Sequence, residues 1–387
     1  MFDVSDSDEA RLLALRSEFP TLDHNTHLVS HSLGAVPQRA RDYLSRYLDE
    51  WEEESVGAWT AHWLPFIDEL ADLIARVLGA PPGTVVLGPN VSTLESLVAS
   101  CFDFAGPRNR VVYTDLNFSS VNYVWQEQRR RGAEVVVVEA DDGVRAPTAR
   151  LLEAIDERTL IVPVSHVLFR SSGMQDVRGI VERAHAVGAL VLLDTYQSAG
   201  TVPLSIADWG VDFCVGGSIK WACGGPGTAY LYVDPDLYGR LRPAQTGWFA
   251  HARPFGFESG PLEPTEGRWR FMNGTPTIPA LYAARAGWEL LAEAGVEAIR
   301  EKSLRQTALL RREAEARGFV VNTPRADAER GGTLCFDRDG AQELSRALLE
   351  RGMLHDFRPR CGLRVSPHYY TTDEEIRRFF DAIDELA

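Results

Sequence analysis

Short apolar runs alternate with segments of helical periodicity between about residues 84 and 194, and this alternation constrains the fold more than any other feature. The apolar runs are 84–87, 110–113, 134–139, 160–167 and 190–194, and helical patterns lie between them at 94–102, 119–131, 147–156 and 176–187. Runs rich in Val, Leu and Ile that alternate with helices form parallel sheets covered by helices on both faces. The sequence therefore predicts an α/β domain, with ligands bound beyond the carboxyl ends of its strands.

The last third of the chain has a different pattern. Helical segments at 279–295 and 296–317 are followed by short apolar runs that alternate with two further helices, which predicts a smaller α+β domain. A chain of 387 residues is long enough for two domains. We expect an N-terminal arm and helix over residues 1–58 that pack on the small domain. We expect the large α/β domain over 59–277 and the small domain over 278–387.

The charge and composition of the chain argue against several classes of binding partner. The net charge of −15, with no basic stripe to offset it, argues against nucleic acid or an anionic membrane as a partner. No apolar run is long enough to span a bilayer, and residues 1–6 are acidic rather than signal-like. Five cysteines without a CxxC pair favour buried free thiols in a reducing cytoplasm. The nine histidines have no metal-ligand spacing, so we expect no metal site.

Lys220 is the most distinctive candidate for chemistry. It is one of only two lysines in the chain, and it lies between two glycine clusters after the apolar run 213–215. A lysine amine becomes nucleophilic when burial or a neighbouring charge lowers its pKa, whereas arginine stays protonated. A solvated surface charge is the alternative, but the apolar and glycine-rich flanks favour a buried, reactive amine.

Asp194 ends the apolar strand 190–193, at the edge where a parallel sheet binds its ligands. Such an Asp often caps a turn, and that alternative stays open. A strand-end Asp followed by a strand-end Lys is also the pair that pyridoxal phosphate requires, because the carboxylate keeps the pyridine nitrogen protonated and the lysine forms the Schiff base.

The turn 88–93 precedes the predicted helix 94–102. Ser92 with Glu95 three residues later predicts a capping box. The same turn is equally suited to hold a phosphate, because the start of a helix offers free N–H groups and a partial positive charge. The loop 27–37 has small polar residues and a glycine and is polar enough to line a site.

Several segments together resemble a known family. They are Asp194-Thr-Tyr-Gln-Ser-Ala-Gly200, Gly217-Ser-Ile-Lys-Trp221, Gly224-Gly-Pro-Gly227, Gly247-Trp-Phe-Ala-His251, Asn273-Gly-Thr-Pro276 and the segment 363–370. From about residue 20 to its end, the chain resembles the fold-type I pyridoxal-phosphate enzymes. It is most similar to the class V aminotransferase group and, within it, to kynureninase-like members. The resemblance implies a pyridoxal 5′-phosphate cofactor and a homodimer whose active site is shared between subunits.

The resemblance also implies roles for individual residues. Lys220 would carry the cofactor and move the proton at the substrate's Cα, and Asp194 would bind the pyridine nitrogen. Arg364 would bind the substrate's α-carboxylate as a bidentate fork. The other implied cofactor contacts are Gln197 at the phenolic oxygen, Phe118 stacked on the ring, Ser92, Thr93 and Ser218 on the phosphate, and Trp248 and Thr275 completing the site.

The reaction is less sharply defined than the cofactor. A kynureninase-like enzyme forms a Cα carbanion and cleaves beyond Cβ to release alanine. This sequence departs from kynureninase at Ile219, Gln197, Val121 and Cys223, where that family has Tyr, His, Asp and Asn. β-Elimination or C–S cleavage, transamination and epimerisation are therefore alternatives, as is a protein that binds the cofactor without turnover. Cysteine desulfurases also carry a Gln at position 197, but Cys361 is too near Arg364 to match their nucleophile loop.

Overall fold

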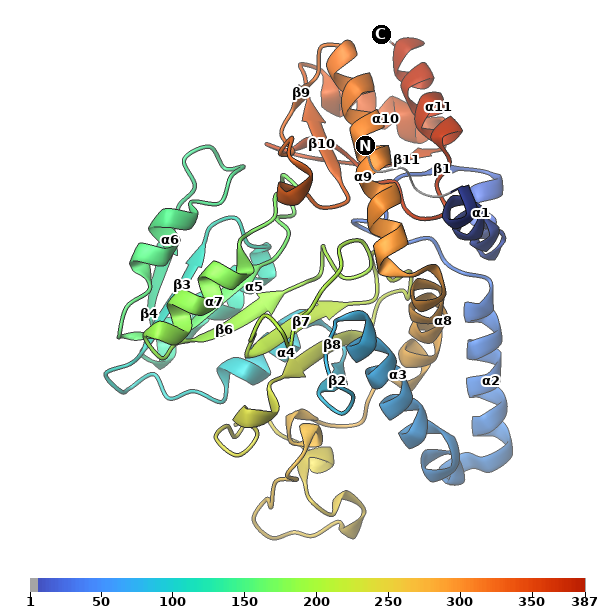
Figure 1. Cartoon of the computed structure of the whole chain (residues 1–387). Coiled ribbons are helices and arrows are strands. Elements are labelled where there is room, and N and C mark those ends of the chain that lie inside the picture. Colours follow the sequence, from blue (N-terminus) through green and yellow to red (C-terminus); the bar gives the residue numbers. More distant parts are fainter. Residues whose placement is uncertain (1–5, 387) are drawn as a thin grey trace.

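The computed structural model describes residues 6–386, so the expectation for residues 1–5 falls outside it (Figure 1). Its large sheet has seven strands in the order β2-β8-β7-β6-β5-β3-β4. The strands are β2 (Val85–Gly88), β3 (Arg110–Thr114), β4 (Glu134–Val138), β5 (Thr159–Ser165), β6 (Leu190–Asp194), β7 (Phe213–Gly217) and β8 (Ala229–Val233). Strands β3 to β7 are parallel to one another, which confirms the predicted α/β class.

Strand β8 is the one element of this sheet that we did not predict. It returns after the glycine-rich turn 224–227 and pairs antiparallel with β7 on one side and with β2 on the other. Its five residues are all buried. The pairing joins β2 to β7 through β8. Strand β7, which precedes Lys220, therefore has a paired strand on each side.

Helices cover both faces of the large sheet. One face packs against α4 (Val91–Ala99) and α5 (Ser119–Glu127). The other face packs against α3 (Leu64–Val77), α6 (Thr148–Ala154), α7 (Val177–Ala186) and α8 (Ile278–Ala294). A separate apolar core lies on each face, as a sheet buried on both sides requires.

The helical stretch that starts at Trp59 has two parts. Residues 59–78 begin with a π-helical turn, Trp59–Trp63, and α3 starts only at Leu64. Pro65 explains the position of this boundary, because proline has no N–H to donate and is tolerated only in the first turn of a helix.

The C-terminal part forms a second sheet, in the order β12-β13-β10-β9, with its own core. Its elements are α9 (Val296–Ala316), β9 (Val320–Val321), β10 (Leu334–Asp337), α10 (Ala341–Glu350), β11 (Met353–Leu354), β12 (Asp356–Arg358), β13 (Gly362–Val365) and α11 (Asp373–Asp384). Figure 1 shows these elements in orange and red, gathered above the large sheet. This arrangement confirms the predicted α+β character of the smaller part.

The N-terminal segment touches both parts of the molecule. Strand β1 (Thr26–His27) pairs in parallel with β11, and α1 (Asp6–Ala14) lies against α9. Helix α2 (Arg39–Glu54) packs along α8 (Figure 1). The domain boundaries themselves stay a prediction. Within residues 6–386 no helix has the length and apolarity needed to cross a membrane, and all five cysteines are unpaired.

Candidate active site

The carboxyl ends of three neighbouring strands meet at one cavity. In the sheet register, Ser165 of β5 lies beside Asp194 of β6, and Asp194 lies beside Val215 of β7. Lys220 follows β7 directly. A cavity of about 280 Å³ opens here, lined by Ser32, Asn90, Val91, Ser92, Phe118, Ser120, Val121, Ser165, Val167, Phe169, Asp194, Tyr196, Gln197, Ile219 and Lys220. Lys220 and Asp194, far apart in sequence, therefore face the same space.

The Lys220 amine has two aromatic neighbours and a lowered pKa. Its Nζ lies 4.4 Å from the centre of the Tyr196 ring and 5.5 Å from that of Phe118. Burial lowers the pKa of Lys220 from 10.5 to about 8, although the Asp194 charge opposes this shift. A substantial fraction of the amine is therefore neutral, and nucleophilic, near pH 8.

The Asp194 carboxylate is held by the chain around it. One oxygen accepts the backbone N–H of Tyr196 at 2.8 Å, and the other accepts the Ser165 hydroxyl at 3.3 Å. Burial raises the pKa of Asp194, while these bonds and the nearby Lys220 act against the shift. A cation placed at its cavity face would favour the ionised form.

Gln197 closes another side of the cavity. Its Nε2 donates to the carbonyl of His31 at 3.0 Å, and its Oε1 accepts the indole N–H of Trp221 at 3.3 Å. One amide hydrogen remains for a ligand. Phe118 lies across the cavity, 44% exposed, and meets Phe169 edge to face at 5.3 Å.

The cap of helix α4 differs from our expectation. Asn90, not Ser92, is the N-cap: its side chain accepts the backbone N–H of Thr93 at 2.9 Å. Glu95 is fully buried and accepts the indole N–H of Trp125 at 3.1 Å, so the predicted capping box is wrong. Asn90 caps the helix in preference to Ser92 because it lies one residue before the first helical residue, Val91. From that position a side chain reaches the free N–H groups of the first turn. Ser92, inside the first turn, lines the cavity instead.

Four of the candidate cofactor residues do not line this cavity within the chain. Thr93 and Thr275 line a second cavity of about 230 Å³, on the other side of the turn before α4. Trp248 packs in an aromatic cluster, with ring centres 4.0 Å from Phe249 and 5.4 Å from Phe255. The fully buried Ser218 accepts the indole N–H of Trp288 at 2.9 Å. Their roles stay predictions.

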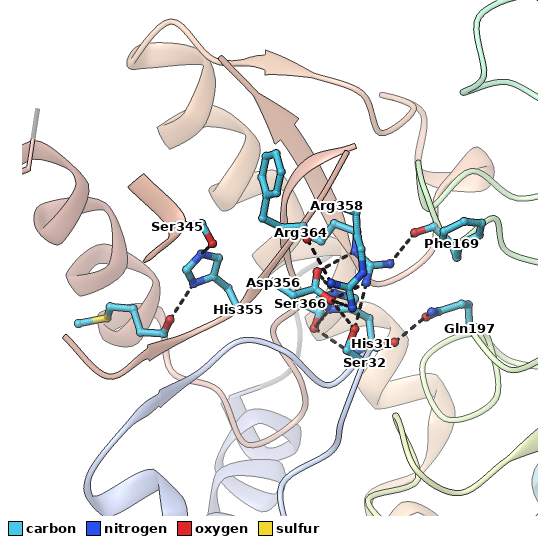
Figure 2. Close-up of polar contacts among 12 residues, drawn as sticks. His31, Ser32, Phe169, Gln197, Ser345, His355, Asp356, Arg358, Arg364 and Ser366 are labelled. Atoms are coloured by element: carbon cyan, nitrogen blue, oxygen red, sulfur yellow. Dashed lines mark hydrogen bonds and ion pairs between the residues drawn. The ribbon is translucent and has the colours of Figure 1, made fainter. Parts of the chain in front are cut away.

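Arg364 is buried behind Ser32 and Phe169 rather than on the cavity wall. Figure 2 shows its guanidinium surrounded by groups of the protein itself. Asp356 binds it through two contacts, Nε–Oδ1 at 2.8 Å and Nη2–Oδ2 at 2.5 Å. Asp356 could not be recognised from the sequence, because its relation to Arg364 depends on the pairing of β12 with β13.

The cavity is also lined by Tyr196, Ser165 and Ser32, which were not among the site residues that we predicted from the sequence. Tyr196 and Ser165 lie beside Asp194, at strand ends that the sequence did mark, so their positions could have been inferred. Ser32 belongs to the loop that we considered polar enough to line a site. Asn117, which follows β3, binds the backbone of β5: it donates to the carbonyl of Pro163 at 2.9 Å and accepts the N–H of Ser165 at 3.0 Å.

The residues that meet in the cavity fit pyridoxal phosphate. Lys220 provides an amine of lowered pKa, Asp194 provides a buried carboxylate and Phe118 provides a ring face. The start of α4, with Val91 and Ser92 on the wall, provides an anion site. Among residues 6–386, no group of three or more His, Cys, Asp or Glu side chains is arranged to hold a metal ion.

Comparison with known proteins agrees with this geometry. The family model described as aminotransferase class-V matches residues 30–379. The chain belongs to the class V aminotransferase family. Two curated relatives are similar over almost the whole chain. The uncharacterized aminotransferase YcbU of Bacillus subtilis is 32% identical, covering 96% of this chain and 96% of its own length. The kynureninase of Geobacillus thermodenitrificans is 29% identical, covering 95% and 90%.

Solved structures support the fold of this class V family member. The apo structure of a cysteine desulfurase from Thermococcus onnurineus NA1 superposes with a TM-score of 0.85 at 20% identity. It covers 96% of this chain and 97% of its own. At that identity the match establishes the fold alone. The predicted resemblance to the class V group is confirmed, and members of this family bind pyridoxal phosphate.

Proposed function

We infer that this protein is a pyridoxal-phosphate-dependent enzyme that acts on an α-amino acid with kynureninase-like chemistry, cleaving the substrate beyond Cβ. The observation that carries the proposal is the meeting of Lys220 and Asp194 in one cavity. When bound, the cofactor's ring would accept the electron pair left when a proton leaves the substrate's Cα. The rest of the chemistry would come from side chains of this chain.

Lys220 would hold the cofactor and then act as the base at Cα. Its pKa of about 8 keeps part of the amine neutral at physiological pH, so it can take a proton and return it. The rings of Tyr196 and Phe118 beside Nζ would limit how the amine can turn during this step.

Asp194 would hold the pyridine nitrogen. The backbone N–H of Tyr196 fixes the orientation of its carboxylate, and the cation of the protonated ring would offset the cost of its burial. Ser92 and the start of α4 would bind the phosphate. Thr93, Ser218, Trp248 and Thr275 remain candidates for the same site in the proposed homodimer, with Thr275 reaching the cavity of the partner.

The substrate's side chain would lie among apolar and aromatic groups. Val121, Val167, Phe169 and Ile219 line the cavity, which suits an aromatic or apolar side chain. Lyase chemistry at Cβ, including C–S cleavage, is the second candidate, because Gln197 stands where kynureninases have His. In the described chain no cysteine lines the cavity, so a C–S lyase reaction here would proceed without a protein thiol.

The proposal is tested by adding L-kynurenine to the protein purified with pyridoxal phosphate and measuring L-alanine release. The controls are Lys220→Ala, which removes the amine, and Lys302→Met, which removes the other lysine of the chain. Alanine release by the wild type and Lys302→Met, but not by Lys220→Ala, supports the kynureninase-like reaction. Sulfur-containing amino acids that yield pyruvate instead would support the lyase candidate. A protein that takes up no cofactor would contradict both.

A further inference from the structure

The guanidinium of Arg364 is already paired with a carboxylate of the protein, that of Asp356. Asp356 on β12 lies directly opposite Arg364 on β13 in the antiparallel register. Its two oxygens meet Nε and Nη2, the side edge of the guanidinium, at 2.8 and 2.5 Å. This is the bidentate arrangement that arginine offers to any carboxylate. The place that an α-carboxylate would take on this edge is therefore filled by the protein.

The remaining donors of Arg364 are also largely used. A second hydrogen of Nη2 goes to the Ser32 hydroxyl at 3.0 Å, and Nη1 donates to the carbonyl of Phe169 at 2.8 Å. A guanidinium has five N–H groups, so a single Nη1 hydrogen is left. A substrate carboxylate cannot form a bidentate pair with Arg364 unless one of these partners moves.

Asp356 has partners that do not depend on Arg364 (Figure 2). His31 Nε2 lies 3.1 Å from Oδ1, and the Ser32 hydroxyl donates to Oδ2 at 2.5 Å. The carboxylate of Asp356 can only accept, so His31 Nε2 carries the hydrogen that meets it. In the neutral ring Nδ1 then accepts the Ser366 hydroxyl at 2.7 Å, and the Ser366 oxygen accepts the backbone N–H of His31 at 3.2 Å.

A second cation, the guanidinium of Arg358, lies beside Asp356. The Nη2 of Arg358, from the same short strand, lies 3.2 Å from Oδ2, and the Arg358 side chain is 52% exposed. Asp356 itself is 13% exposed. If Arg364 left, the Asp356 carboxylate would keep His31, Ser32 and Arg358, so its charge would not be buried without a partner.

We propose that Asp356 is a built-in competitor for the substrate's α-carboxylate at Arg364, and that substrate binding transfers Asp356 to Arg358. The inference rests on the proposed function. Its physical basis is exchange: one carboxylate replaces another on the same guanidinium, so the net gain from the substrate's carboxylate is small. Asp356 thereby sets how strongly the site prefers an amino acid over a plain amine, which makes it a specificity-determining residue.

The test compares two probes that differ only in the carboxylate. L-Alanine and ethylamine are titrated into the holoprotein, and the absorbance of the bound cofactor reports each dissociation constant. Asp356→Asn keeps the shape of the side chain and removes its charge. The exchange predicts that this variant binds L-alanine at least about tenfold more tightly than wild type, with ethylamine unchanged within about twofold.

The matched control is Asp384→Asn. Asp384 forms the same bidentate pair with Arg317, at 2.7 and 2.6 Å, on α11 and remote from the cavity. This control leaves both dissociation constants unchanged. Equal or weaker L-alanine binding by Asp356→Asn would overturn the proposal, because it would mean that Asp356 holds Arg364 in place for the substrate instead of competing with it.

Two further measurements guard against a variant that folds poorly. Propionate, a carboxylate without an amine, should raise the melting temperature of Asp356→Asn more than that of wild type or Asp384→Asn, because it fills the vacated edge of Arg364. Arg358→Gln, at an exposed position, should weaken L-alanine binding about threefold to tenfold, because it removes the cation to which Asp356 is transferred. No propionate effect and no loss in Arg358→Gln would both count against the transfer.

The two levels of inference fail in different ways. If the protein does not bind the cofactor through Lys220, neither probe changes the absorbance in any variant. If the cofactor binds but Asp356 does not compete, both probes respond and their ratio is the same, or lower, in Asp356→Asn.

Discussion

The two lysines of this chain have similar electrostatics and different surroundings. Burial lowers the pKa of both Lys220 and Lys302 to about 8. Each has an acidic neighbour that opposes the shift, Asp194 for Lys220 and Glu9 for Lys302. Lys302 is 1% exposed on α9, and its Nζ lies 3.6 Å from a Glu9 oxygen. Lys220 opens into a cavity with two aromatic rings beside its Nζ.

This comparison separates burial from function. A lowered pKa makes an amine nucleophilic, but the amine of Lys302 is buried beside Glu9 and does not line the cavity of Asp194. Lys220 combines the same pKa with access, a carboxylate across the cavity and an anion site at a helix start. Perturbed pKa values mark candidate sites only together with such a cavity.

The strongest way to break the comparison is to remove each amine. Lys220→Ala should lose the absorbance of covalently held cofactor and all turnover, a loss of at least about a thousandfold, because Lys302, the other lysine of the chain, does not line the cavity. Lys302→Met should keep both within about twofold. Absorbance spectra and a turnover assay on the two purified variants measure this difference. Activity retained in Lys220→Ala would end the assignment.

Arg364→Gln should weaken binding of L-alanine to the holoprotein by about 2–4 kcal/mol. The variant loses the paired N–H donors of the guanidinium, and it also leaves the Asp356 charge near the substrate's carboxylate. Ethylamine, which has no carboxylate, should bind as before, and the cofactor titration measures both. The double variant Asp356→Asn with Arg364→Gln should recover part of the loss. Unchanged L-alanine affinity in the single variant would remove Arg364 from the site.

The effect of Lys302→Met on the free energy of unfolding tests whether burial lowers the pKa of Lys302. The native pKa of about 8 lies below the unfolded value of 10.5, so the unfolded chain binds more protons between these pH values. The Lys302 penalty is therefore full below pH 8 and fades as pH rises to about 10.5. Replacing it should raise the free energy of unfolding by about 1–3 kcal/mol at pH 7, with little gain above pH 10.5. Urea unfolding across this pH range measures it, and a gain independent of pH would contradict the burial argument.

The smallest expected effect concerns the phosphate site. Ser92→Ala should weaken retention of the cofactor by about 1 kcal/mol, the contribution of one hydrogen bond. Ser96, one turn further along α4, bonds to the carbonyl of Ser92 at 2.7 Å and does not line the cavity, so Ser96→Ala is the matched control. Equilibrium dialysis against pyridoxal phosphate compares the two. An equal loss in both variants would assign the effect to the helix rather than to a phosphate contact.

The α/β part of the fold was predictable because strands β3, β5, β6 and β7 are largely buried on both faces, and such strands appear as continuous apolar runs. Strand β8 was not predicted, because a return strand after a glycine-rich turn has no partner helix to mark it. Lys220 and Asp194 could be paired from sequence because strand ends converge at one edge of a parallel sheet. Asp356 could not be found this way, since its role depends on the register of β12 and β13 and on a loop more than three hundred residues away.

Ser92 and Asn90 illustrate a finer limit. Both residue types cap helices well, and only the backbone geometry decides which one lies at the cap. Ser92, which is not used as the cap, then becomes available to the cavity, so an error of two residues in the position of a helix cap changes the assignment of a ligand contact.

The most direct test of the central claim is to reduce the protein with borohydride in the presence of pyridoxal phosphate and map the modified peptide by mass spectrometry. The account predicts one phosphopyridoxyl group per chain, on Lys220, with none on Lys302. A label on Lys302, or no label on the peptide that contains residue 220, would contradict it.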